Sequence, residues 1–240
     1  MARRPLRIHV SSHCKDTDGS LRQPTHHCAD EHLMSGVLIA LEGIDGSGKS
    51  TQAGLLAHSI NARLTFEPGA TSLGVALRSL LLDSATRDAA ISTRAEALLM
   101  IADRAQDMAE NILPALNAGN NVVTDRYSAS TIAYQGYGRG IDVDHLQAAI
   151  DLATGGLSPA LNILLDLPVS LALERLAGSG KKVDRFEGAG VKFLEKVRTG
   201  YLSMAAADPS HWMVIDSNAP TDQLAASILE QVRSRLAAHL

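Results

Sequence analysis

The sequence predicts an α/β fold in which helices cover both faces of a parallel β-sheet. Two observations support this: short apolar runs, which are typical of strands buried on both faces, and longer amphipathic segments that separate them. Strands that alternate with helices form βαβ units, whose strands run parallel. The 240 residues suit one main domain, with 45% hydrophobic and 20% charged residues. This composition excludes a disordered chain, and no apolar run approaches the roughly 18 residues of a membrane span.

Five apolar segments are expected to be the strands of this sheet. Four are clear, and the one near Leu64–Phe66 is weaker. In chain order they are residues 37–41, 64–66, 122–124, 161–165 and 212–215. The expected sheet therefore has five strands, with helices in the intervals between them.

The segment 93–117 is the clearest helix. Thr93 and Glu96 form a capping-box pattern at its start, and Gly119 suits a cap at its end. Pro168 suits the first turn of a later helix, after the fourth strand. The apolar stripe of the 93–117 helix is expected to consist of Leu98, Ile101, Ala105, Met108, Ile112 and Leu116.

The first 34 residues differ from the rest in composition. They contain Cys14, Cys28 and five of the nine histidines, and they show no helical or strand periodicity. Cysteine and histidine are the usual zinc ligands, but their spacing here frames no tetrahedral site. We expect residues 1–34 to be a disordered extension, or translation to begin at Met34, with zinc binding as the alternative. The main domain is expected to span residues 35–240.

The charge balance bears on the partners of the chain. The 22 basic and 26 acidic residues give a formal net charge of −4. A chain of this charge has no overall field that attracts nucleic acid, and with 3% aromatic residues it has few rings that could stack on bases. Two cysteines exclude a disulfide framework, and the main domain has none, so a cytoplasmic location is expected.

A glycine-rich motif directly follows the first strand. Residues 43–51, GIDGSGKST, fit the pattern G-x-x-x-x-G-K-[ST], and a helical run follows them. Glycines let the backbone wrap around an anion with several N–H groups pointing inward, and the helix adds the positive end of its dipole. The motif predicts a three-layer P-loop NTPase fold whose nucleotide-binding residues are Gly43, Ile44, Asp45, Gly46, Ser47, Gly48, Lys49, Ser50 and Thr51.

The polar residues in and beside this motif have expected roles in ATP chemistry. Lys49 is expected to bridge the β- and γ-phosphates, and the Ser50 hydroxyl to bind Mg²⁺. Asp125 ends the third strand, where a carboxylate suits an outer-sphere partner of the metal. Arg126 follows it and could clamp a phosphate between donor and acceptor, although such a pair is also compatible with a solvated salt bridge. No Asn-Lys-x-Asp segment for guanine recognition follows, which argues against a GTPase.

Further segments, in a fixed order after the motif, carry a family resemblance. Residues 67–71 (EPGAT), 98–106 (LLMIADRAQ), 125–127 (DRY) and 133–136 (AYQG) resemble the corresponding segments of bacterial thymidylate kinases. The likeness covers nearly all of residues 35–240. It implies Mg-assisted, ATP-dependent phosphorylation of dTMP to dTDP, for dTTP biosynthesis, by a homodimer with a five-stranded parallel sheet and a small lid.

The resemblance also implies roles for single residues. Arg126 would hold the acceptor phosphate, and Arg104 and Gln135 would hydrogen-bond the thymine edge. Tyr134 would lie against the sugar, where a 2′-hydroxyl would clash, and Asp45 would approach the 3′-hydroxyl or a phosphate-bound water. The expected substrate-binding residues are Glu67, Arg78, Met100, Arg104, Arg126, Ser130, Tyr134 and Gln135, and the expected catalytic residues are Lys49, Arg126, Asp45 and Arg185.

Residues 178–190 are expected to form the lid. Phosphoryl transfer needs positive charge on the migrating group beyond one lysine and the metal. Some relatives place an arginine inside the motif, at the position of Ser47, so in this chain the lid is expected to supply the charge. The candidates are Lys181, Lys182 and, as the first choice, Arg185, with a solvated basic loop as the alternative.

Three residues depart from the family pattern. Met100 stands where a phenylalanine usually stacks on thymine, and a methionine packs on a ring with about 0.3–1.5 kcal/mol. Phe66 and Ala70 replace the arginine and the second glycine of Arg-Glu-Pro-Gly-Gly, which removes one acceptor-side charge. Two alternatives follow: a kinase for another nucleoside monophosphate, and a nucleotide-binding regulatory relative that no longer transfers phosphate.

Overall fold

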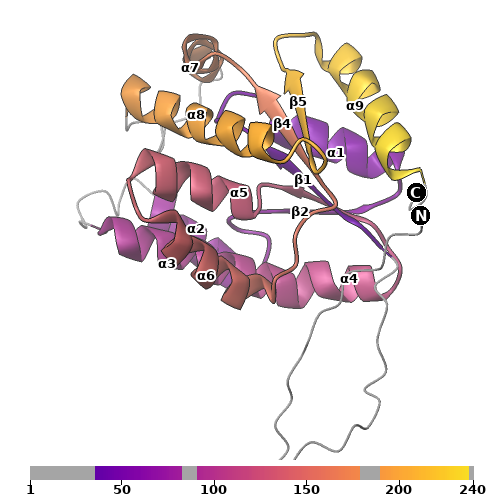
Figure 1. The fold of residues 1–240 in the computed structure, drawn as a ribbon. Coiled ribbons are helices and arrows are strands. Elements are labelled where there is room, and N and C mark those ends of the chain that lie inside the picture. The colour runs from indigo at the N-terminus through magenta and orange to yellow at the C-terminus, as the bar shows by residue number, and fades with distance from the viewer. Residues whose placement is uncertain (1–35, 83–90, 179–189, 238–240) are drawn as a thin grey trace, which may run out of the picture.

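A five-stranded parallel sheet lies at the centre of the computed structural model, which describes residues 36–82, 91–178 and 190–237 (Figure 1). The strand order is β2-β3-β1-β4-β5, and every pairing is parallel. The predicted fold class is confirmed, and all five expected segments are strands. Their bounds are β1 (Leu38–Glu42), β2 (Arg63–Phe66), β3 (Val122–Asp125), β4 (Leu161–Asp166) and β5 (Trp212–Asp216).

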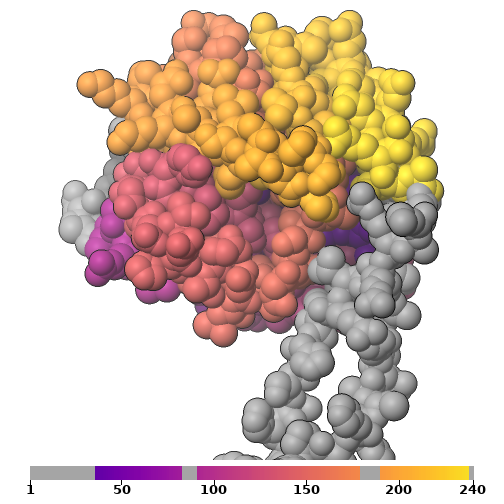
Figure 2. Space-filling model, in the orientation of Figure 1, coloured from indigo at the N-terminus to yellow at the C-terminus, as the bar shows by residue number. Residues whose placement is uncertain are grey.

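Helices cover both faces of the sheet (Figure 1). On one face α1 and α9 pack together against the strands, and on the other η2, α4 and α8 do so. Figure 2 shows α8, in orange, lying against the salmon surface formed by the segment from α5 to α6. The bounds are α1 (Lys49–Ser59), α2 (Ser72–Leu82), α3 (Thr93–Asp107), η2 (Met108–Ile112), α4 (Leu113–Asn117), α5 (Ser128–Thr131), η3 (Ile132–Gly138), α6 (Val143–Thr154), α7 (Val169–Gly178), α8 (Val191–Ala207) and α9 (Thr221–Leu236), where η2 and η3 are π-helices.

The helix expected over residues 93–117 is three consecutive elements rather than one. The α-helix α3 gives way to the π-helix η2, and α4 resumes the α-helical pattern. The interruption lies just ahead of Pro114, which has no N–H to donate and whose ring collides with the carbonyl four residues earlier. Gly119 has a φ of 80° and its N–H donates to Leu116 O at 3.1 Å, as a C-terminal cap requires.

The start of α3 differs from the predicted capping box. Ser92, rather than Thr93, is the cap: its side-chain oxygen accepts a hydrogen bond from Ala95 N at 3.2 Å. Glu96 is fully buried and accepts a hydrogen bond from η3 instead. Leu98, expected in the buried stripe, is 60% exposed. The prediction for the first turn was wrong because Thr93 and Ser92 both have capping hydroxyls and only the backbone decides between them.

The register of the sheet brings the ends of several strands together. Asp125 is level with Leu41 of β1 on one side and with Phe66 of β2 on the other. The residues that follow these strands, among them Glu67 and Arg126, therefore lie along one carboxyl edge. Ligands of open α/β sheets bind outside this edge.

Some predictions fall on residues that are outside the described ranges. These are the extension at residues 1–34, residues 179–189 of the expected lid, and with them Lys181, Lys182 and Arg185. Across the residues that the structure does describe, no helix combines the length and the apolar character needed to cross a membrane.

Candidate active site

The glycine-rich motif forms a loop between β1 and α1. Gly46 and Gly48 have φ values of 84° and 89°, a region that disfavours side chains. A Cβ on Gly46 would also lie 2.6 Å from the carbonyl oxygen of Ala172. Both glycines are therefore required for the loop to close around an anion, as the motif predicted.

Lys49, at the start of α1, lies inside the loop. Its side chain is 5% exposed, and its Nζ donates to Ile44 O at 2.9 Å and lies 3.7 Å from Asp45 Oδ1. Burial lowers the pKa of Lys49, and the nearby Arg126 lowers it further. A phosphate bound here, in addition to the Asp45 carboxylate, would favour the charged form of the Lys49 side chain.

Ser50 and Asp125 lie together beside the loop. Ser50 Oγ donates to Asp125 Oδ2 at 2.5 Å, and Asp125 Oδ1 is buried without a hydrogen-bond partner among the described residues. Hard oxygen atoms at the end of a phosphate loop are the donor set that Mg²⁺ prefers. Ser50, predicted to bind Mg²⁺, and Asp125, predicted as its outer-sphere partner, therefore fit the ion.

Arg126 is the centre of the second half of the site. Its φ is 76°, in the left-handed region that non-glycine residues rarely adopt. Its Nη2 forms a 2.5 Å ion pair with Asp45 Oδ1 and donates to Tyr134 OH at 3.3 Å, and its Nη1 donates to Ser130 Oγ at 3.1 Å. The guanidinium therefore joins the phosphate loop to α5 and η3.

Asp45 is held between two cations. Burial alone would raise the pKa of Asp45, but Arg126 and Lys49 outweigh burial and keep that pKa well below its usual range. Tyr134 OH also donates to Asp45 Oδ2 at 3.1 Å. Asp45 is therefore ionised at neutral pH, and it forms an ion pair with Arg126 in this structure.

Glu42 lies beneath Arg126 and was missed by the sequence analysis. It is fully buried and accepts hydrogen bonds from Tyr127 N at 2.9 Å, Ser130 Oγ at 2.6 Å and Tyr201 OH at 3.0 Å. Burial raises its pKa against these hydrogen bonds. Its position at the end of the first strand, just ahead of the motif, was the signal that could have found it.

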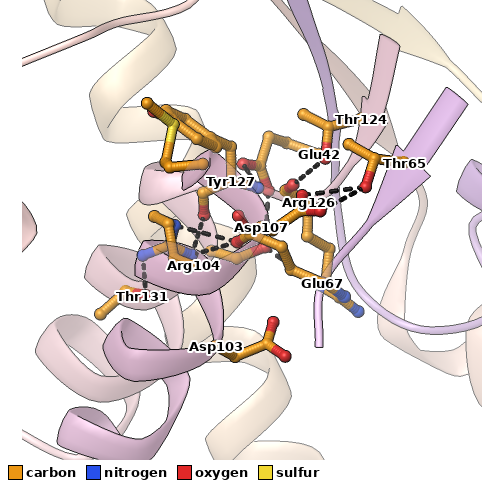
Figure 3. A network of polar contacts seen from close by, with 12 residues as sticks. Glu42, Thr65, Glu67, Asp103, Arg104, Asp107, Thr124, Arg126, Tyr127 and Thr131 are labelled. Carbon is orange, nitrogen blue, oxygen red and sulfur yellow. Dashed lines mark hydrogen bonds and ion pairs between the residues drawn. The ribbon is translucent and has the colours of Figure 1, made fainter. Parts of the chain in front are cut away.

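Arg104 of α3 is the hub of a neighbouring network (Figure 3). It is 2% exposed, and its Nε donates to Glu67 Oε2 at 2.9 Å. Its Nη1 donates to Thr131 Oγ1 and its Nη2 to Tyr127 O, each at 2.8 Å. A guanidinium held on three sides in this way has one fixed orientation.

Three buried carboxyl groups surround Arg104 (Figure 3). Burial raises the pKa of Glu67 to about 8 against the attraction of Arg104, and that of Asp103 to about 6. Burial also raises the pKa of Asp107, which accepts from Thr65 Oγ1 at 2.7 Å. Glu67 Oε1 and Asp103 Oδ2 are buried without a partner among the described residues. Burial therefore favours the protonated form of Glu67, and the contact with Arg104 opposes it.

The titration of Glu67 predicts a pH dependence of stability. Between its unfolded value of 4.5 and its folded value of about 8, the folded protein keeps a proton that the unfolded chain has released. The free energy of unfolding therefore falls as the pH rises through this window, by at most about 1.4 kcal/mol per pH unit. Urea unfolding at several pH values is expected to show a smaller fall in Glu67→Gln than in wild type; parallel curves for the two proteins would contradict the assignment.

All eight predicted substrate-binding residues line one pocket next to the phosphate loop. Asp45 and Arg126 close its end nearest the loop, and Arg104 and Gln135 lie in its wall. The complete lining is Asp45, Glu67, Pro68, Arg78, Leu82, Met100, Arg104, Arg126, Ser130, Thr131, Tyr134 and Gln135. The structure brings the predicted residues together in one pocket, and it adds Pro68, Leu82 and Thr131, to which the sequence analysis gave no role.

Tyr134 forms one wall of this pocket with its ring. It lies edge-on to the rings of Phe193 and Tyr201 of α8, at centroid distances of 6.1 and 6.4 Å. The guanidinium of Arg126 lies 5.0 Å from the Tyr134 ring centroid. Packing on three sides fixes the ring, so it can act as a steric wall.

The three departures from the family pattern occupy different surroundings. Met100 is half-buried in the pocket, where its thioether can pack on a planar ring. Phe66 ends β2 and is 43% exposed. The positive φ in the segment after it belongs to Gly69, at 122°, and Ala70 has none. Ala70 is therefore free of the backbone strain that replacement of a glycine can cause.

A second hollow lies on the other side of the phosphate loop. Arg175 of α7 crosses it, and its Nη1 and Nη2 donate to Gly46 O at 3.4 Å and Ser217 O at 3.1 Å. Sequence reasoning gave Arg175 no role, because a lone arginine on a helix is usually a solvated residue. The hollow is lined by Gly46, Ser47, Gly48, Thr51, Gln52, Arg175, Ser217, Asn218, Ala219, Pro220, Thr221 and Leu224.

Comparisons with known proteins agree with this geometry. The family model described as Thymidylate kinase matches residues 41–228. A thymidylate kinase from Desulforudis audaxviator is 44% identical over 209 residues, which cover 85% of this chain and 93% of that protein. One from Thermosynechococcus vestitus is 44% identical over 225 residues, covering 87% and 90% of the two chains. The crystal structure of a thymidylate kinase from Ehrlichia chaffeensis has a TM-score of 0.67 and 28% sequence identity, and covers 82% of this chain and 98% of its own.

Proposed function

The chain belongs to the thymidylate kinase family and phosphorylates dTMP to dTDP with ATP, and from this premise we propose how its own residues divide the work. The phosphate loop binds the triphosphate of ATP, and the pocket beside it binds dTMP. The observation that carries this proposal is the ion pair between Asp45 and Arg126, at the point where loop and pocket meet. Donor and acceptor phosphates would approach each other there, as in-line transfer requires.

Arg126 and Lys49 are proposed as the cations that bind the reacting phosphates. Arg126 exchanges its partner Asp45 for the phosphate of dTMP, and Lys49 binds the transferring phosphoryl group. Asp45 then accepts a hydrogen bond from the 3′-hydroxyl of the acceptor sugar or from a phosphate-bound water. Positioning and charge compensation carry the reaction, since phosphoryl transfer needs little covalent chemistry from the protein.

The rest of the pocket is proposed to select thymine and deoxyribose. Arg104 and Gln135 hydrogen-bond the polar edge of the base, while Met100 packs on its face. The Tyr134 ring blocks a 2′-hydroxyl. Arg78, Ser130 and Glu67 complete the acceptor site. Glu67 acts by orienting Arg104, from which it accepts a hydrogen bond.

Ser50 and Asp125 are proposed to hold Mg²⁺, Ser50 directly and Asp125 as an outer-sphere partner. The ion would neutralise the developing charge on the ATP phosphates. The hollow crossed by Arg175 is proposed to receive the nucleoside of ATP, because it opens on the far side of the loop from the dTMP pocket. Arg185, outside the described residues, is proposed as the remaining cation on the migrating group.

A coupled ADP-release assay with ATP and Mg²⁺ tests the proposal, with dTMP, dUMP, ribo-TMP, dCMP and dGMP as acceptors. Activity confined largely to dTMP is expected. A preference for ribo-TMP would contradict the role of Tyr134, and a preference for dCMP or dGMP would contradict the roles of Arg104 and Gln135. A folded protein that binds ATP and releases no ADP with any acceptor would favour the regulatory alternative.

The chain is proposed to act in the cytoplasm as a homodimer that associates through α2 and α3. Only Gly74 and Leu81 of the 11 residues of α2 are buried. Four large apolar side chains on the two helices are exposed by between 42% and 61%, namely Leu73, Val75, Leu80 and Leu98. Exposed apolar side chains on two helices that contact each other are typical of a protein interface.

A charge placed in this surface is expected to dissociate the dimer. Leu98→Glu would bury an unpaired carboxylate in the interface, which costs several kcal/mol and favours the monomer. Sedimentation velocity measures the change in mass. Leu152→Glu, on α6 and 88% exposed, is the matched control and should remain dimeric. A monomeric wild type, or a dimeric Leu98→Glu variant, would contradict the assignment of this surface.

A further inference from the structure

Glu96 lies behind the acceptor pocket and has no role in the mechanism given above. It is fully buried in the first turn of α3. Its Oε1 accepts hydrogen bonds from Gln135 Nε2 at 3.1 Å and from Arg139 Nε at 3.2 Å, and its Oε2 accepts one from Arg139 Nη2 at 3.2 Å. A buried carboxylate is costly unless it is paired, so a second function for it is worth seeking.

The two-point contact with Arg139 determines the chemistry of Glu96. A carboxylate whose two oxygens both accept from one guanidinium is a hydrogen-bond acceptor and not a donor. Arg139 is itself fixed, because its guanidinium lies 4.5 Å from the ring centroid of Phe193 on α8. The Arg139–Glu96 pair is therefore a fixed acceptor that faces the back of Gln135.

This acceptor decides which way the amide of Gln135 points. The amide has an NH₂ end and an oxygen end of nearly equal shape, and only the NH₂ end can bond to an ionised carboxylate. Gln135 is 2% exposed and lines the acceptor pocket, and its Nε2 is the end that donates to Glu96. With the NH₂ end bound to Glu96, the oxygen is the end that remains for a ligand.

We propose that Glu96 is a positioning residue for base selection: it fixes the Gln135 amide with its oxygen toward the ligand. An oxygen there accepts a hydrogen bond from a pyrimidine with a ring N–H, as thymine and uracil have. It repels cytosine, whose corresponding ring nitrogen is an acceptor. This inference rests on the proposed binding of dTMP in this pocket and explains how the pocket distinguishes the two pyrimidine classes.

The Glu96→Gln variant removes the fixed acceptor. A neutral glutamine in place of Glu96 can donate as well as accept, so the Gln135 amide can turn round. The ratio of kcat/KM for dTMP to that for dCMP is expected to fall at least tenfold, while KM for ATP stays the same. Arg104 still opposes the cytosine amino group, so dTMP should remain the better substrate. Glu195→Gln, an exposed glutamate of α8, is the matched control.

A double-mutant cycle separates positioning from a general loss of structure. If Glu96 acts through Gln135, adding Glu96→Gln to Gln135→Leu should leave the dTMP/dCMP ratio within about twofold of that of Gln135→Leu alone. An unchanged ratio in the Glu96→Gln single variant, or an equal fall when Glu96→Gln is added to Gln135→Leu, would overturn the proposal. If wild type and Glu96→Gln discriminate against dCMP equally well, only this inference is refuted. If the wild-type protein is inactive on dTMP, the proposed function is refuted.

A measurement on wild-type protein covers the case in which Glu96→Gln fails to fold. The ring N–H of 5-fluoro-dUMP is more acidic than that of dTMP because of the fluorine. When mildly alkaline pH removes this proton, a fixed Gln135 oxygen faces a negative nitrogen and binding weakens. KM for 5-fluoro-dUMP is therefore expected to rise relative to KM for dTMP as the pH rises above neutral. A constant ratio of the two would overturn the proposal.

Discussion

Replacing Lys49 with alanine is expected to lower kcat by about a thousandfold while the protein remains folded. Lys49 is buried in the phosphate loop, and its ammonium group is within 3.7 Å of Asp45. It is the cation proposed to bind the transferring phosphoryl group, and its removal would leave part of the charge that develops there in the transition state uncompensated. Single-turnover measurement of dTDP formation isolates the chemical step.

The stability of the Lys49 variant separates this effect from unfolding. The pKa of Lys49 is lowered by burial, so the charged form is costly to bury and its removal should not lower the unfolding temperature appreciably. Lys196→Ala, at an exposed lysine of α8, is the control and should retain full activity. Near wild-type turnover by a folded Lys49→Ala protein would disprove the assignment of this lysine to the transition state.

Replacing Arg126 with alanine is expected to lower kcat/KM for dTMP by at least about a thousandfold, because it removes the cation that is proposed to hold the acceptor phosphate. It also leaves Asp45 with Lys49 as its remaining cationic partner among the described residues. That carboxylate would then repel the incoming phosphates. The affinity for ATP, measured by calorimetry without dTMP, should change far less than kcat/KM for dTMP.

Two further variants sharpen the test of Arg126. Arg126→Lys keeps the charge and loses the forked geometry that reaches Asp45, Ser130 and Tyr134, so intermediate activity is expected. Arg63→Ala, at an exposed arginine of the edge strand β2, should be fully active. If Arg126→Ala lowered ATP affinity and dTMP turnover equally, the arginine would belong to the donor site instead.

The parts of the site that could be predicted from sequence are those with a local signature. The glycines of residues 43–48 are needed for left-handed backbone and close approach, and the strand before them and helix after them fix where they lie. Asp125 and Arg126 were predicted beside them because the carboxyl ends of parallel strands meet at one edge. The acceptor residues came from the family resemblance, since their spacing alone has no unique meaning.

The parts that could not be predicted are buried carboxylates. Glu42, Glu96 and Asp107 are buried, and nothing in the sequence indicates it, because glutamate and aspartate are rarely fully buried. What makes them buried is a set of partners from distant segments, such as Tyr201 for Glu42 and Arg139 for Glu96. No pattern within one helix or strand contains that information. The prediction that Leu98 is buried was wrong for a related reason. Periodicity identifies the apolar face of a helix, but it does not show which element covers that face.

The left-handed backbone of Arg126 has a consequence for how this enzyme can evolve. A side chain in that conformation costs on the order of 1–2 kcal/mol, and only glycine avoids the cost. Thr124 and Leu41 hold the backbone in place, through hydrogen bonds from Thr124 Oγ1 to Arg126 O at 2.7 Å and from Arg126 N to Leu41 O at 3.0 Å. Glycine at this position would avoid the backbone cost, but it would also remove the guanidinium that pairs with Asp45 and lies beside the buried Glu42. The ion pair therefore offsets the backbone strain at this single residue, and a stabilised variant must be sought elsewhere in the chain.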